Sequence, residues 1–195
     1  MEIDSRIKEQ LAETYFGEGV IAFYNKDYEK AIECYKRAVT CKPDAAYAYY
    51  NMGIAYAAWN GQYEKAIECY EKAIEYKPDY ANAYNNMGHA YKHWNEQYEK
   101  AIECWEKAIE LKPDYANAYN NMGNAYAAWN EQYEKAIECW EKAIEYNPDL
   151  ADAYFFMGGA YGLMGDGNKA ISCIKQAAQL GDEDAKQWLL ENGIK

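Results

Sequence analysis

The sequence lacks any long hydrophobic run. Its longest uncharged stretches, such as the one between Asp114 and Asn130, are interrupted by Asn and Gly and fall short of the roughly 20 apolar residues that a membrane-spanning helix needs. The first ten residues mix both charges and contain no apolar core followed by a small-residue cleavage site, so they do not read as a secretory signal. We therefore expect a cytoplasmic protein with no membrane partner.

The sequence is also poor in basic residues. It carries 20 Lys and Arg against 32 Asp and Glu, and the resulting formal charge of −12 is spread over the whole chain. Binding to a phosphate backbone depends on clustered Lys and Arg that release counterions. We therefore predict that nucleic acids are not partners, and acidic membrane surfaces are disfavoured for the same reason.

What the sequence does contain is a repeat. The four prolines, Pro43, Pro78, Pro113 and Pro148, recur at a constant interval of 35 residues, and residues 46–80, 81–115 and 116–150 align without gaps. A fixed period of this length is typical of a protein built from stacked structural units.

Each repeat contains two helical patterns separated by a turn. In the second repeat, Tyr49, Met52, Gly53 and Tyr56 follow the i, i+3, i+4, i+7 spacing of a helix with one buried face. The same spacing recurs after the turn in Tyr63, Ala66, Ile67, Tyr70, Ala73 and Ile74. Glu and Lys alternate on the other face of this second helix, which indicates contact with solvent. Each repeat is therefore predicted to be a helical hairpin closed by proline.

The positions shared by the repeats carry a family resemblance. In the third repeat they are Tyr84, Met87, Gly88, Tyr91, Ala101, Trp105, Ala108 and Pro113. This set of columns resembles the tetratricopeptide repeat. The resemblance implies an all-α fold, a right-handed superhelical solenoid of antiparallel helix pairs, whose function is to hold another protein or peptide.

The resemblance covers nearly the whole chain, which we predict to be a single domain over residues 1–195. Its five repeats lie at about 12–45, 46–80, 81–115, 116–150 and 151–183, and a capping helix follows at 184–193. The first and last repeats are atypical, as terminal repeats that meet solvent usually are. The three middle repeats have one extra residue in the turn within the hairpin, and we expect Trp59, Trp94 and Trp129 to pack over it.

Cysteine and histidine form no pattern typical of a catalytic or metal site. Cys34, Cys69, Cys104, Cys139 and Cys173 share one column and lie a full repeat apart, and no CxxC pair exists. A disulfide needs Cα atoms within about 7 Å, so we expect free thiols. His89 and His93 have i, i+4 spacing but no third ligand. No nucleophile stands at a plausible spacing from a base. We predict no enzymatic activity, no metal and no cofactor.

The face of each first helix that the core does not use carries amides in place of charges. Asn is a poor helix former, so a freely solvated face would more naturally hold Glu and Lys. Amides both donate and accept hydrogen bonds, which suits the backbone of an extended peptide. The resemblance implies that this face lines a concave groove for peptides or helices. The predicted ligand-binding residues are Tyr47, Tyr50, Asn51, Asn82, Asn85, Asn86, His89, Lys92, Asn117, Asn120, Asn121 and Asn124.

Two alternatives remain open. The Asn columns are also compatible with a plain family consensus that serves no ligand. In addition, near-identical repeats with exposed ends can stack end to end, so the chain can form homo-oligomers as a structural solenoid with no dedicated ligand.

Overall fold

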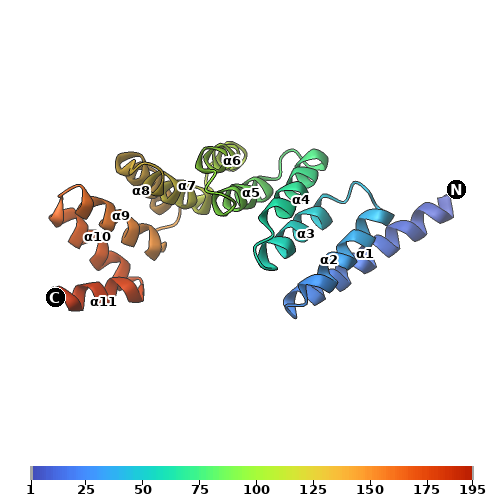
Figure 1. The fold of residues 1–195 in the computed structure, drawn as a ribbon, viewed down its shortest axis with the longest axis horizontal. Helices are drawn as coiled ribbons and strands as arrows, with labels where there is room; N and C mark the ends of the chain where they lie inside the picture. Colours follow the sequence, from blue (N-terminus) through green and yellow to red (C-terminus); the bar gives the residue numbers. More distant parts are fainter. Residues whose placement is uncertain (1, 195) are drawn as a thin grey trace. The chain divides into compact units, whose positions relative to one another are not determined.

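The computed structural model describes residues 2–194, which form helices joined by short turns (Figure 1). The helices are α1 (Glu2–Tyr24), α2 (Tyr28–Cys41), α3 (Ala46–Ala58), α4 (Tyr63–Tyr76), α5 (Ala81–His93), α6 (Tyr98–Leu111), α7 (Ala116–Ala128), α8 (Tyr133–Tyr146), α9 (Ala151–Leu163), α10 (Gly167–Gln179) and α11 (Glu183–Glu191). No strand occurs between residues 2 and 194, so the predicted all-α fold is confirmed. Within the same range, no helix is long and apolar enough to cross a membrane.

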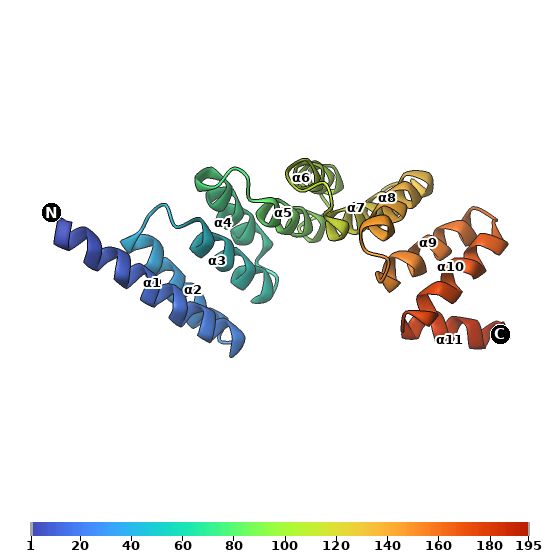
Figure 2. The ribbon, with the colours of Figure 1, turned by 180° about the vertical axis from the view of Figure 1, so that it is seen from behind.

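The helices belong to two compact units, Met1–Leu111 and Lys112–Lys195. In the first unit, α1 packs on α2, α3 on α4, and α5 on α6 (Figures 1 and 2). In the second unit, α7 packs on α8, α9 packs on α10, and α11 contacts α10. The predicted helix pairs are confirmed, and α11 occupies the place at which a capping helix is expected.

A glycine on the first helix of each of the first four hairpins lets a large ring of the second helix come close. A Cβ built on Gly53 would lie only 2.6 Å from the Tyr70 ring, and one on Gly88 would lie 2.8 Å from the Trp105 ring. Tyr70 and Trp105 are among the most completely buried side chains of the protein. The column of glycines is therefore a packing feature that fixes the distance between the two helices.

The turns within the middle hairpins contain two consecutive residues in the left-handed region. These are Asn60 and Gly61 (φ 57° and 64°), Asn95 and Glu96 (57° and 52°), and Asn130 and Glu131 (57° and 54°). The shorter first turn has one such residue, Lys26 (φ 62°). The extra residue of the middle repeats therefore adds a second residue with left-handed backbone to the turn. Trp59 and Trp94 are half-buried and pack against the core beside these turns, as the sequence predicts.

Helix α1 is longer than the sequence pattern indicates. The first repeat is expected from about residue 12, whereas α1 begins at Glu2 and runs to Tyr24 without a break. Residues 4–11 of this extension are exposed, and they include the apolar side chains of Ile7 and Leu11. The repeat pattern does not predict this segment, because residues 4–11 occupy no buried position of the repeat.

Candidate functional site

The first helices of neighbouring hairpins contact one another. In the first unit α1 contacts α3 and α3 contacts α5, and in the second unit α7 contacts α9. The side of these helices that faces away from their hairpin partners is therefore continuous within each unit. We call it the first-helix face, and it carries the residues that the sequence predicts to bind a ligand.

Charge separates the first helices from the second helices. Helices α3 and α7 contain no charged residue, and Lys92 is the one Lys, Arg, Asp or Glu in α5. By contrast, α4 carries Glu64, Lys65, Glu68, Glu71, Lys72 and Glu75, and α6 repeats the same arrangement. In the middle repeats the acidic surface thus lies over the second helices, while the first-helix face of α3, α5 and α7 is polar and nearly uncharged. Helix α1 is an exception, because it carries charges of both signs.

Asn86 lies at the centre of a hydrogen-bond network that joins α5 to α3. Its Nδ2 donates to the Tyr50 hydroxyl of α3 at 3.1 Å, and its Oδ1 accepts from Asn85 Nδ2 at 3.2 Å. Burial raises the pKa of the Tyr70 hydroxyl in α4, and interaction with the Asn86 amide opposes that shift. Asn86 therefore holds neighbouring hairpins together before any ligand is present.

Two of the predicted ligand-binding residues do not lie on an open surface. Asn85 and Asn120 are only 8% and 7% exposed. The backbone oxygen of Asn85 accepts from Trp105 Nε1 at 3.0 Å, which places this turn of α5 against its hairpin partner. The Oδ1 atom of Asn120 is buried without a hydrogen-bond partner. Helical spacing predicts that both residues lie on the exposed face of the first helix. Their side chains are instead buried between helices.

The remaining predicted residues divide into exposed and half-buried groups. Tyr47, Asn82, His89 and Asn117 are exposed, whereas Tyr50, Asn51, Lys92, Asn121 and Asn124 are half-buried. Several of the amides already serve internal hydrogen bonds. Asn51 Nδ2 donates to the Tyr47 carbonyl at 2.8 Å, and Asn124 Oδ1 accepts from Trp140 Nε1 at 3.0 Å. The exposed group therefore offers the surface that a ligand reaches first.

His89 and His93 form a ring pair at the end of α5. Their ring centroids are 4.3 Å apart, and Tyr63 stacks on His93 at 5.5 Å. Desolvation by the surrounding atoms lowers the pKa of His89 to about 4, and the neighbouring His93 and Lys92 cations act in the same direction. Both rings are therefore neutral near pH 7. Within residues 2–194 no group of three His, Cys, Asp or Glu is placed to hold a metal.

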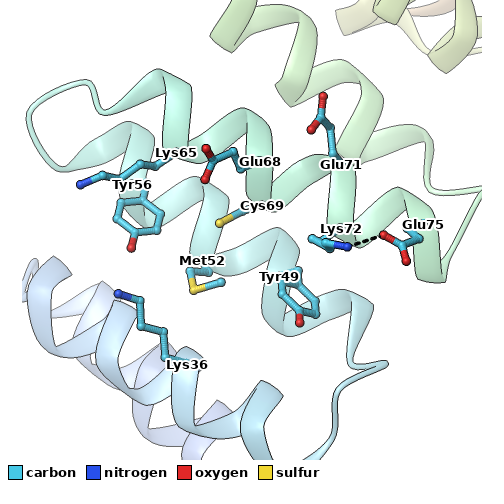
Figure 3. A pocket seen from close by; sticks show the side chains of 10 residues that line it. All are labelled: Lys36, Tyr49, Met52, Tyr56, Lys65, Glu68, Cys69, Glu71, Lys72 and Glu75. Atoms are coloured by element: carbon cyan, nitrogen blue, oxygen red, sulfur yellow. Dashed lines mark hydrogen bonds and ion pairs between the residues drawn. The ribbon is translucent and has the colours of Figure 1, made fainter.

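A different depression opens between α2, α3 and α4 (Figure 3). It has a volume of about 650 Å³, and Met52 and Cys69 are among the residues that line it. Lys36 and Lys65 place their Nζ atoms 5.9 and 5.5 Å from the centre of the Tyr56 ring. Burial raises the pKa of Cys69 to about 12, so the thiol is protonated at neutral pH. We call this depression the second-helix pocket, and it is a rival surface for a partner.

Sequence reasoning missed one exposed aromatic residue of the first-helix face. Phe156 on α9 occupies the column of Asn86 and Asn121, yet it is 44% exposed and stacks on Trp140 with centroids 6.2 Å apart. Phe155, its neighbour on α9, is half-buried and packs against α10 and α11. Comparing the columns repeat by repeat, in place of following one helical stripe, would have identified Phe156.

Replacing Asn86 with Ala is expected to lower the free energy of unfolding by about 1 kcal/mol, because the Tyr50 hydroxyl of the neighbouring hairpin loses its donor. Asn51→Ala is the matched control. Asn51 occupies the same column but bonds only to the carbonyl one turn earlier, so its loss should change stability by less than about 0.5 kcal/mol. Urea denaturation followed by circular dichroism measures both. Equal effects of the two substitutions would contradict the network.

Comparison with known proteins places this arrangement in a family. A family model described as TPR repeat matches residues 19–58, 60–93, 95–128 and 130–165, and a second, described as Tetratricopeptide repeat, matches residues 151–180. No curated protein sequence matches the chain.

Solved structures agree with the family model. A crystal structure of MamA protein is 29% identical, with a TM-score of 0.77, and the match covers 91% of this chain and 95% of that one. A MamA fragment from Desulfovibrio magneticus RS-1 is 25% identical over 87% and 94% of the two chains, with a TM-score of 0.77. YrrB, described as a TPR protein with an unusual peptide-binding site, shares the fold at 22% identity, with a TM-score of 0.72 over 91% and 90%. The chain belongs to the tetratricopeptide-repeat family, whose helical repeats form protein-interaction scaffolds.

Proposed function

We propose that this protein binds a segment of another protein on its first-helix face. The observation that carries the proposal is the contrast, in the three middle repeats of one acidic chain, between nearly uncharged first helices and strongly charged second helices. Removing water from neutral amides that regain hydrogen bonds is much less costly than desolvating carboxylates. The first-helix face is thus the surface of this protein that a partner covers at the least cost.

The chemistry of the face suits a polypeptide backbone. Asn82 and His89 on α5 are exposed, and Lys92 lies half-buried beside them. An amide and a neutral imidazole each offer a donor and an acceptor, so they match the alternating N–H and C=O groups of an extended segment. Tyr47, which is 57% exposed, adds an aromatic surface on α3. In the second unit Asn117 and Asn124 occupy the columns of Asn82 and His89, and Asn121 occupies the column of Asn86.

Asn85, Asn86 and Asn120 have a supporting role in this proposal. The burial of Asn85 and Asn120 and the internal bonds of Asn86 fit them to hold the helices that display the exposed residues. The relative YrrB supports peptide binding by this fold, though not by these residues. Catalysis forms no part of the proposed role, and tetratricopeptide-repeat proteins are in general scaffolds without enzymatic activity.

The proposal is tested with a random peptide library displayed on phage and selected on the full chain. Peptides that bind are then measured by fluorescence anisotropy against Asn82→Ala, His89→Ala and the double variant. Each lost contact should weaken binding by about 0.5 to 1.5 kcal/mol, so the double variant should lose roughly 5-fold to 150-fold in affinity. Stability should change little, since both side chains are exposed.

The control variants lie on the second helices. Glu68 lines the second-helix pocket, and Glu103 occupies the same column on α6. The variants Glu68→Ala and Glu103→Ala should both bind the selected peptides with the affinity of the wild type. The proposal is wrong if no peptide is enriched, or if the Glu variants abolish binding while Asn82→Ala and His89→Ala do not. The second outcome would assign recognition to the opposite side of the hairpins.

Self-association is a second candidate, and the exposed apolar residues near the two ends of the chain favour it. Ile7 and Leu11 on α1 are 52% and 39% exposed, and Leu190 on α11 is 74% exposed. If end-to-end stacking is the function, sedimentation velocity should show a mass that rises with protein concentration, and Leu190→Glu should abolish the rise. A constant monomer mass up to about 100 µM, a range in which weak interfaces of this class assemble, would exclude it.

A further inference from the structure

A second cavity of about 650 Å³ lies in the first unit, between α1, the α2–α3 loop and the start of α3. Five of its twelve lining residues are alanines, and Phe16, Tyr47 and Tyr76 add aromatic surface. The residues that matter for its chemistry are Glu13, Phe16, Ala38, Lys42, Ala45 and Ala48. We call it the Ala45 pocket.

The next repeat contains the same site with its space filled. Ala45 is the residue just before α3, and Tyr80 is the residue just before α5. The two have nearly the same backbone, with φ and ψ of −74° and 76° for Ala45 and −85° and 75° for Tyr80. The Ala45 N–H bonds the Lys42 carbonyl at 3.2 Å, as the Tyr80 N–H bonds the Lys77 carbonyl at 3.1 Å. Their Cβ atoms therefore project in equivalent directions.

The Tyr80 side chain shows what this space accepts. Tyr80 is 8% exposed and packs with Ala73 and Ala83. Its ring centroid lies 4.7 Å from that of Tyr50 and 5.3 Å from that of Tyr47. The Nζ atom of Lys77 lies 5.7 Å from the centre of the same ring. Aromatic neighbours, small residues and one cation thus enclose a phenol ring.

Each wall of the Tyr80 site has a counterpart around the Ala45 pocket. The counterparts of Tyr47, Tyr50, Ala73, Lys77 and Ala83 are Glu13, Phe16, Ala38, Lys42 and Ala48, and all five line the pocket. Packing supports this alignment of α1 with α3. A Cβ built on Gly19 would lie 2.6 Å from the Tyr35 ring, and a Cβ built on Gly53 would lie at the same distance from the Tyr70 ring. The pocket consequently has the walls of a tyrosine site and lacks the tyrosine.

We propose that the Ala45 pocket binds a tyrosine side chain presented by the protein segment on the first-helix face. The pocket adjoins that face through Tyr47, which belongs to both, so the proposal rests on the proposed function. Phe16 supplies the aromatic wall and Lys42, which is ion-paired to Glu9 at 3.1 Å, supplies the cation. Two walls differ from the Tyr80 site, since Phe16 replaces Tyr50 and Glu13 replaces Tyr47. A carboxylate there offers an acceptor for a phenol hydroxyl and selects tyrosine over phenylalanine.

The test uses 4-methylphenol, the side chain of tyrosine, and needs no knowledge of the partner. Titration of the ¹⁵N-labelled full chain should give saturable shifts at Phe16, Ala45 and Ala48, with a dissociation constant on the order of 1 mM for so small a ligand. The saturated analogue 4-methylcyclohexanol has nearly the same size and should bind about 5-fold more weakly, because its ring lacks the π electrons with which Phe16 and Lys42 interact.

Ala45→Tyr fills the pocket from within and should abolish these shifts, while Ala45→Ser keeps the pocket open and should bind as the wild type does. Tyr80→Ala empties the equivalent site and should raise the stoichiometry from one 4-methylphenol to two. The proposal is overturned if the wild type shows no saturable shifts at the pocket, if Ala45→Tyr binds like the wild type, or if folded Tyr80→Ala binds one equivalent. Should Tyr80→Ala fail to fold, the Ala45 variants decide.

The two proposals fail in different ways. If the first-helix face binds peptides but the Ala45 pocket binds no tyrosine, selected peptides will lose affinity on Asn82→Ala and His89→Ala yet bind Ala45→Tyr as they bind the wild type. If instead the first-helix face is not a binding site, 4-methylphenol will still distinguish Ala45→Tyr from Ala45→Ser, while Asn82→Ala leaves peptide affinity unchanged.

Discussion

Trp105→Ala is expected to lower the free energy of unfolding by about 3 to 5 kcal/mol, a loss of about the size measured for fully buried aromatic residues. Trp105 is 0% exposed, and its indole N–H donates to the Asn85 carbonyl at 3.0 Å. Truncation therefore leaves a large cavity between α5 and α6 and removes the indole donor from the Asn85 carbonyl. Urea denaturation monitored by circular dichroism gives the free energy directly.

Trp105→Tyr is the matched control for this substitution, because the preceding repeat places Tyr70 in the same column. Tyr70 is 2% exposed and approaches Gly53 as closely as Trp105 approaches Gly88. The tyrosine variant should therefore lose only about 1 kcal/mol, as volume-similar core replacements do. If tyrosine and alanine destabilise the protein equally, ring packing against the glycine is not what holds the hairpin together.

Gly88→Ala should destabilise the protein by about 1 to 3 kcal/mol, although alanine favours helix by about 1 kcal/mol in the unstrained case. An added Cβ would lie 2.8 Å from Trp105 and 2.9 Å from the backbone oxygen of Ala101. A side chain can rotate away from such a contact, but a carbonyl within a helix cannot, so α5 and α6 must separate.

Gly159→Ala provides the opposite expectation on α9. No atom lies within 4 Å of the Cβ that would be added there. The substitution should then show the helix preference alone and raise stability by about 0.5 to 1 kcal/mol. Thermal denaturation of the two variants beside the wild type separates the effects. A rise in melting temperature for Gly88→Ala would mean that the hairpin tolerates a wider spacing than its packing indicates.

The fold was readable from the sequence because each structural requirement recurs at the same position of every repeat. Gly88 and Trp105 illustrate this, since a small residue on one helix and a ring on the other appear again one repeat later as Gly123 and Trp140. The first ten residues of α1 were not readable in the same way. They belong to no column, and their exposed apolar residues give no repeat signal.

The candidate site was less readable, and the asparagines show why. A helical stripe assigns Asn82, Asn85 and Asn86 to one face, but a helix inside a stack has neighbours on several sides. Only the structure reveals that Asn85 turns inward and that Asn86 reaches Tyr50, which lies 36 residues earlier. The Ala45 pocket was detectable in principle, because alanine stands there in a column that elsewhere holds Tyr80, Tyr115 and Leu150.

The hydrogen bond between Asn86 and Tyr50 also bears on how such a gene can change in length. Its partners belong to adjacent hairpins, and the contacts of the Tyr80 ring likewise reach one hairpin back and no further. An in-frame duplication of 35 residues, from Ala46 to Tyr80, would therefore keep a Tyr50 next to Asn86 and keep Tyr47 and Tyr50 next to each copy of Tyr80. Recombination between the middle repeats is thus a simple evolutionary route to a longer first-helix face.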